Sequence, residues 1–229
     1  MDSAWLISLL HFADSAFPTG GFAHSLGLET YCQTGLIRDG GGLEAFLRAE
    51  LEGAAAPADA TAAAAVLSAG QRRDLAACRE LDETLDAMKP AVELRGASRQ
   101  MGRQTLRVAH AVTGDRQLET YERLVEEGVA PGHQGVAVGL AGAALDWTAE
   151  AAAAVLLYST ASLLVGAGLR LLPLGQLEGQ RILWALGPLV ARLAAEAARR
   201  PPAELWSFAP GLEIQAMRHA RLDQRLFRS

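Results

Sequence analysis

Apolar residues recur along most of the chain at the spacing of an α-helix. Leu43, Phe46 and Leu47 show the pattern, because residues three and four positions apart lie on the same side of a helix. No segment alternates between apolar and polar residues as a half-buried β-strand does. The pattern therefore predicts an all-α protein without a sheet.

Glycine, proline and capping residues divide this pattern into about ten helical segments. Asp74 and Thr148 are placed to cap two of them, and Gly114 is placed to end a third. Gly187 and Pro188 predict a break inside another. The expected helices cover residues 5–12, 22–33, 43–52, 58–69, 74–88, 90–112, 118–127, 136–145, 151–169, 175–198 and 212–227. The linkers are short, so we expect one compact helical domain over residues 1–229.

Residues 151–169 carry no charge, and the segment is about as long as a bilayer-spanning helix. It is rich in alanine, serine, threonine and glycine, and it lacks an aromatic belt and flanking clusters of lysine and arginine. A helix that is apolar on all sides is also expected at the centre of a helical protein. We interpret the segment as a central apolar helix; a membrane span is the alternative.

Composition narrows the class of protein. Aromatic residues make up only 6%, which favours helices packed closely through small side chains. The net charge of −5 and the pI of about 5.6 give no basic footprint for nucleic acid. Cys32 and Cys78 cannot form a disulfide framework, and the first residues lack the basic region of a signal peptide. We expect a cytoplasmic protein that binds neither nucleic acid nor membrane.

Residues 17–29 (FPTGGFAHSLGLE) are the most unusual segment. Pro18 fixes a turn, and the glycines allow positive φ and close approach of the backbone. Ser25 and Glu29 are four positions apart, so on a helix they share a face and can form a hydrogen bond. The segment either pins a local turn or presents backbone and polar groups to a partner.

Most catalytic and cofactor motifs are missing. Neither Gly20-Gly21 nor the glycine run at 135–142 has the Gly-Lys-Ser/Thr of a P-loop, and the second run is better suited to close helix packing. The five histidines are scattered without metal-ligand spacing, and there is no Gly-x-Ser-x-Gly elbow. We expect no catalytic residue, metal site or cofactor. The rival interpretation is a helical-bundle hydrolase or transferase that uses His24, Ser25 and Glu29.

The last expected helix combines a basic stripe with an apolar edge. Arg218, Arg221, Arg225 and Arg228 form the stripe, and Leu222, Leu226 and Phe227 lie beside it. In an acidic protein this pattern suggests docking on an acidic surface of another protein. The alternative is a solvated helix face paired with the protein's own carboxylates.

Four groups of residues, in order along the chain, also form a recognisable set. They are Pro18, Gly20, Gly21, Phe22, Ser25, Gly27, Leu28 and Glu29; Arg95, Ser98, Gly102 and Arg103; residues 170–176 (RLLPLGQ) with 179–182 (GQRI); and Met217-Arg218-His219 with residues 225–229 (RLFRS). Together they resemble the signature of the urease accessory protein F family (UreF) over nearly the whole chain. The chain departs from that signature at His24, where an aromatic residue is frequent, and at residues 133–135 and Leu163.

The resemblance implies an all-α, usually dimeric protein without an active site, which acts as an adaptor in urease maturation. Its partners would be the D-type (or H-type) accessory protein and the nickel-carrying G-type GTPase, with the urease apoprotein reached through the complex. Nickel would be handled by the GTPase, and residues 211–229 would be a partner-docking helix. The partner-binding residues expected from the resemblance and the patterns above are Pro18, Gly20, Gly21, Phe22, His24, Ser25, Gly27, Glu29, Arg170, Gln176, Arg218, His219, Arg221, Arg225, Leu226, Phe227 and Arg228.

Overall fold

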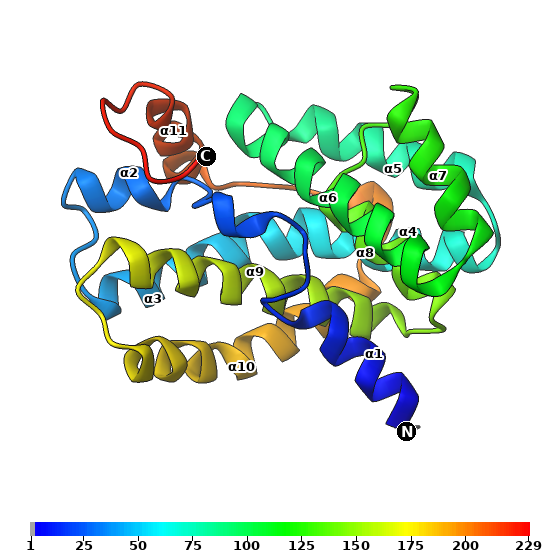
Figure 1. Cartoon of the computed structure of the whole chain (residues 1–229), viewed down its shortest axis with the longest axis horizontal. Coiled ribbons are helices and arrows are strands. Elements are labelled where there is room, and N and C mark those ends of the chain that lie inside the picture. The colour runs from blue at the N-terminus through cyan, green and yellow to red at the C-terminus, as the bar shows by residue number, and fades with distance from the viewer. Residues whose placement is uncertain (1–2) are drawn as a thin grey trace.

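A long apolar helix, α9 (Ala149–Leu171), runs through the middle of the computed structural model, which describes residues 3–229 (Figure 1). The other elements are α1 (Ser3–Ala13), η1 (Gly21–Ala23), α2 (Leu28–Gln33), α3 (Gly40–Glu50), η2 (Leu51–Ala60), α4 (Thr61–Gln71), α5 (Leu75–Met88), α6 (Val92–Thr113), α7 (Arg116–Glu126), α8 (Gln134–Ala144), α10 (Gln176–Arg199), η3 (Pro202–Glu204) and α11 (Pro210–His219). Every regular element within residues 3–229 is helical, so the predicted all-α class is confirmed.

The expected central helix is α9. It packs against α1, α2, α3, α4, α8 and α10, and Thr148 caps its first turn by accepting a hydrogen bond from Ala151 N at 3.1 Å. Within residues 3–229 it is the one helix long and apolar enough to cross a membrane, but 56% of its most apolar window is buried inside the fold. That burial is what a core helix requires.

Close packing explains the glycine run in α8. A Cβ atom at Gly139 would lie 2.6 Å from the carbonyl oxygen of Ala63 and 2.8 Å from Cβ of Val66, both on α4. Only glycine lets the two helix backbones approach this closely. The interpretation of residues 135–142 as a packing surface is therefore confirmed.

Two predicted interruptions are wrong. The expected break at Gly187-Pro188 does not occur, and α10 continues through both residues. Gly187 has no Cβ to clash with the proline ring, and both residues are exposed, so the carbonyl that Pro188 leaves without a donor can be hydrated.

The second interruption was expected between residues 52 and 58, but α3, η2 and α4 form continuous helical turns. Pro57 lies inside η2 and supplies no N–H to the preceding turn. The Gly53 carbonyl in that turn accepts a hydrogen bond from Phe208 N at 2.8 Å. A distant segment thus completes hydrogen bonding around the proline.

Two predicted helices, residues 22–33 and 212–227, are shorter in the structure than expected. Residues 22–33 do not form one helix, because Leu26 (φ 50°) and Gly27 (φ 89°) are left-handed and α2 begins only at Leu28. The predicted helix 212–227 is also wrong in its extent, since α11 ends at His219, and the expected docking segment 211–229 is therefore helical only in its first part. Residues 220–229, called the C-terminal tail below, fold back toward α2 (Figure 1).

Candidate functional site: the junction of residues 17–29 with the C-terminal tail

The turn segment, residues 17–29, is shaped by its glycines. Gly20 and Gly27 have positive φ values of 77° and 89°. A Cβ at Gly27 would lie 3.4 Å from Ala216 N, so α11 packs directly on this turn. Gly21 is buried, and a Cβ there would lie 2.5 Å from Cδ1 of Leu163 on α9. The turn is therefore held between α9 and α11.

The middle of the turn segment binds the end of the tail. The carbonyl oxygen of Ser229 accepts hydrogen bonds from Ser25 N at 2.5 Å, Leu26 N at 3.1 Å and Ser25 Oγ at 2.9 Å. The His24 ring contacts Ser229 Oγ through Nδ1 at 2.7 Å, and Arg228 N donates to Ala23 O at 2.8 Å. The N–H groups of Ser25 and Leu26 thus converge on one oxygen, as successive backbone N–H groups do in anion-binding turns.

Glu29 binds the tail one turn further on. This side chain is only 1% exposed. Its carboxylate accepts hydrogen bonds from Leu226 N at 2.7 Å and Phe227 N at 3.1 Å, and contacts Nε2 of His219 at 2.8 Å. Burial by itself raises the pKa of Glu29, but the hydrogen bonds from the tail and His219 outweigh it, and the pKa lies below its usual value. Glu29 is thus a buried, ionised anchor.

His219 connects this anchor to α6. Its Nδ1 lies 2.7 Å from Oε2 of Glu93, and Glu93 also forms an ion pair of 3.2 Å with Arg225. The two ring nitrogens of His219 each face a carboxylate. His219 therefore links Glu29 to Glu93 and, through Glu93, to Arg225 under the tail.

Arg170 of α9 closes the junction at the surface. Its guanidinium lies 4.0 Å from the ring centroid of Phe22 and 4.2 Å from that of Phe227, and its Nη1 donates to Phe22 O at 2.7 Å. Phe227 is buried, whereas Phe22 is 78% exposed. Such cation–π contacts hold the tail and leave one aromatic face open.

Two adjoining cavities lie beneath the junction. The first, about 130 Å³, is lined by residues that include Phe17, Phe22 and His24. His24 Nε2 is buried without a hydrogen-bond partner among residues 3–229. Burial, and secondarily the charge of Arg228, lowers the pKa of His24, so the ring is neutral at pH 7. Both cavities share the lining residues Leu26, Met101, Gln134 and Thr160.

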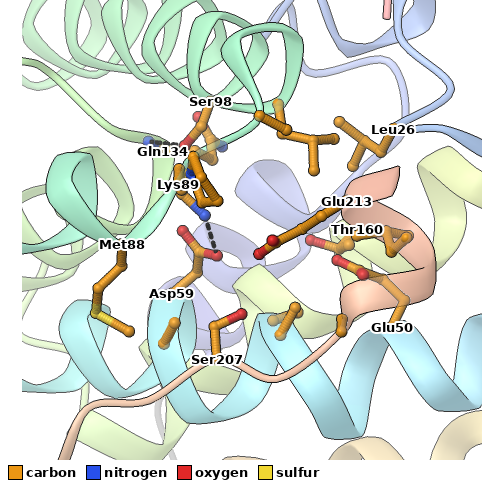
Figure 2. Close-up of a pocket in the computed structure, with 18 of the residues that line it drawn as sticks. Leu26, Glu50, Asp59, Met88, Lys89, Ser98, Gln134, Thr160, Ser207 and Glu213 are labelled. Atoms are coloured by element: carbon orange, nitrogen blue, oxygen red, sulfur yellow. Dashed lines mark hydrogen bonds and ion pairs between the residues drawn. The ribbon is translucent and has the colours of Figure 1, made fainter. Parts of the chain in front are cut away.

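The second cavity, about 90 Å³, contains several charged groups. Figure 2 shows Lys89 paired with Asp59 at 2.7 Å, while Glu50 and Glu213 point into the same space. Glu50 Oε2 is buried without a partner among the described residues, and burial raises the pKa of Glu50 to about 7. Within residues 3–229 no group of histidine, cysteine, aspartate and glutamate is arranged to hold a metal ion.

The structure brings most of the expected partner-binding residues together at this junction. They are Gly20, Gly21, Phe22, His24, Ser25, Gly27, Glu29, Arg170, His219, Arg225, Leu226, Phe227 and Arg228. Pro18 and Gln176 are exposed and, within residues 3–229, form no side-chain hydrogen bond or ion pair with the tail. Arg218 and Arg221 are exposed and form no ion pair within residues 3–229. The single arginine stripe is wrong, because only Arg218 lies in α11.

Glu93 and Ser229 belong to the junction but were not among the residues expected there from the sequence. Glu93 lies in the first turn of α6 and carries no local motif, so its place opposite His219 is set only by tertiary packing. The hydrolase or transferase alternative gains no support. Ser25 and His24 both bond to Ser229, and Ser25 Oγ meets Glu29 only by accepting its backbone N–H at 3.3 Å.

Comparison with known proteins finds relatives of this chain along its whole length. A family model for UreF matches residues 37–187. The urease accessory protein UreF of Paenarthrobacter aurescens (strain TC1) is 36% identical over 229 residues, which cover all of both chains. UreF of Bacillus sp. (strain TB-90) is 32% identical over 98% of this chain and 99% of its own, and UreF of Arthrobacter sp. (strain FB24) is 33% identical over 99% and 98%. The alignment with the Paenarthrobacter protein covers the whole chain and so includes the turn segment and the tail, which lie outside the residues matched by the family model.

Proposed function

The chain belongs to the UreF family of urease accessory proteins, and from this premise we propose that it is a non-enzymatic adaptor in urease maturation. It bridges the D/H-type accessory protein, which contacts the urease apoprotein, and the nickel-carrying G-type GTPase. In this proposal GTP hydrolysis by the GTPase is coupled to nickel insertion, and nickel is cargo that the GTPase carries. The adaptor works as a homodimer in the cytoplasm.

The observation that carries the adaptor proposal is the turn–tail junction. Its inner side is fixed by buried polar groups, above all Glu29, while its outer side stays open. Met217 and Leu226 are about half exposed, and Arg218 and Arg221 are exposed on the same stretch of chain. A rigid backbone that presents apolar and basic side chains is suited to docking, because little conformational entropy is lost on binding.

Charge indicates which partner surface fits. The protein has a net charge of −5, yet Arg218 and Arg221 project from α11 and the following turn without carboxylate partners within residues 3–229. Arginine suits interfaces because its planar guanidinium can bind a carboxylate through two hydrogen bonds. We assign the acidic surface of the D/H-type protein to this position.

The test is capture of purified D/H-type protein by the full chain. In Arg218→Glu/Arg221→Glu, both charges are reversed without breaking an ion pair of the fold, so we expect capture at least roughly tenfold weaker with an unchanged melting temperature. The matched control is Arg116→Glu/Arg123→Glu on α7, which changes the net charge equally. Equal capture by the two double variants would show that the proposed docking position is wrong.

A further inference from the structure

Adjacent arginines occur at two places in the sequence, Arg72-Arg73 and Arg199-Arg200, and the fold brings the two pairs to one groove. Arg72 and Arg73 directly follow α4, while Arg199 is the last residue of α10 and Arg200 follows it. Arg72 and Arg200 line the same groove although they lie far apart in the sequence. In a chain with a net charge of −5, this arrangement concentrates positive charge at one site.

The groove is open and mostly apolar. It holds about 600 Å³ of open space between α4, α5, the end of α10 and η3. Alanines from all four elements line most of it, together with Leu81 and Leu205, and the charged residues in its lining are Arg72, Glu80 and Arg200. Short apolar walls leave room for an apolar side chain of a partner, with arginines beside it.

The two arginine pairs are not neutralised by the fold. Within residues 3–229 none of the four arginines forms an ion pair with a carboxylate. Arginines are favourable at helix C-termini, where the helix end carries about half a negative charge. Each of these two helix ends has two arginines, which exceeds that charge. Positive charge therefore remains to attract an acidic group.

Arg200 gives an independent indication of a missing acceptor. Its guanidinium carbon lies 5.9 Å from the ring centroid of Trp206, and its Nε is buried without a hydrogen-bond partner within residues 3–229. A buried donor without an acceptor is costly, so such donors are normally satisfied by protein, water or a ligand. An acceptor from outside the chain would satisfy Arg200 at the edge of the groove.

We infer that this groove binds an acidic segment of a partner protein. An apolar side chain of that segment enters the groove, and flanking carboxylates pair with Arg72 and Arg200, because guanidinium groups bind carboxylates through two hydrogen bonds. A nucleotide or free phosphate fits less well. Phosphates are bound by N–H groups at helix N-termini, whereas the C-termini of α4 and α10 meet here.

This docking surface is additional to the one in the proposed function. In Figure 1, α5 lies toward the opposite end of the molecule's long axis from α11 and the C-terminus. A partner in the groove would therefore leave the turn–tail junction free.

The test is binding of a fluorescently labelled helical peptide of leucine, alanine and glutamate to the full chain, measured by fluorescence anisotropy. We expect saturable binding that Arg72→Glu/Arg73→Glu weakens at least roughly tenfold with an unchanged melting temperature, since both side chains are exposed and form no ion pair. Ala65→Trp, which fills the groove without changing the charge, should weaken binding similarly. The control is Arg116→Glu/Arg123→Glu on α7, which changes the net charge equally and should bind the peptide as the wild type does.

Two further peptides test the chemistry of the occupant. Lysine in place of glutamate should abolish binding, and serine in place of leucine should weaken it at least tenfold. The docking surface is wrong if the wild type does not bind the acidic peptide, or if the groove variants bind it as well as the control does. Arg72→Glu/Arg73→Glu should still capture the D/H-type protein, so failure of the peptide test would leave the adaptor proposal standing.

Discussion

Substituting Glu29 with glutamine should release the C-terminal tail. In the wild type the carboxylate accepts the N–H groups of Leu226 and Phe227 and contacts His219. Glutamine has one acceptor oxygen, and its NH₂ group would face a donor. A lost charge-assisted hydrogen bond costs about 1.5–3 kcal/mol, and a buried donor left unpaired costs a further 1–3 kcal/mol. We expect a loss of roughly 3 kcal/mol.

For a chain of this length that loss corresponds to a drop in Tm of roughly 6–12 °C if the tail and the core unfold together. If the tail opens by itself, the same energy appears instead as faster hydrogen exchange at the amides of residues 226 and 227. Both the Tm and the amide exchange rates must therefore be measured. Glu126→Gln on the exposed side of α7 is the control and should change neither.

The contribution of Glu29 to folding stability depends on pH in a defined direction. The pKa of Glu29 lies below its ordinary value of 4.5, so the folded state favours the ionised carboxylate. Its contribution is therefore fully present above about pH 4.5 and is lost as the pH falls through the folded pKa. The Glu29→Gln variant should therefore lose less folding stability than the wild type when the pH is lowered through this range. If the variant matches the wild type in Tm, amide exchange and acid profile, Glu29 is not the anchor of the tail.

Two further substitutions test the interior around the junction. Burial raises the pKa of Glu50 from 4.5 to about 7, so the wild type loses stability as the pH rises through that range. By urea unfolding, Glu50→Gln should be roughly 3 kcal/mol more stable than the wild type at about pH 8 and equally stable near pH 4. A stability difference that did not change with pH would show that Glu50 does not titrate in this way. Gly21→Asp should lower the unfolding free energy by about 2–4 kcal/mol, because its side chain would collide with Leu163 and bury a carboxylate. Gly175→Asp is the control, since a Cβ there meets nothing within 4 Å; equal stability of the two variants would refute the collision.

The sequence predicts the helices well where local signals agree with packing. Asp74 and Thr148 accept the capping hydrogen bonds expected of them, and left-handed Gly114 ends α6. The prediction from the sequence fails where tertiary contacts or solvent exposure override a local rule. Pro188 is tolerated inside α10 because its side of the helix faces water, and Pro57 is tolerated because Phe208 donates to the nearby Gly53 carbonyl.

The site was predicted as a set of residues but not as an arrangement. Residues 220–229 have helical spacing, yet Glu29 binds the N–H groups of Leu226 and Phe227 that a helix would use internally. That choice depends on a carboxylate about two hundred positions away, and spacing within the tail carries no information about it. Similarly, the left-handed φ of Leu26 could not be expected, since leucine rarely adopts it.

The bonds between Ser25 and Ser229 join residues 204 positions apart, which gives the junction a place in the order of synthesis. A ribosome that adds about 5–20 residues per second needs roughly 10–40 s to make the intervening chain. During that time the hydrogen bonds from Ser25 and Leu26 to Ser229, and those from Leu226 and Phe227 to Glu29, cannot form. A nascent chain can therefore fold much of its helical core before it displays this surface. Partners that recognise the junction would bind only chains in which residues 220–229 have already been made, so recognition would follow synthesis of the tail.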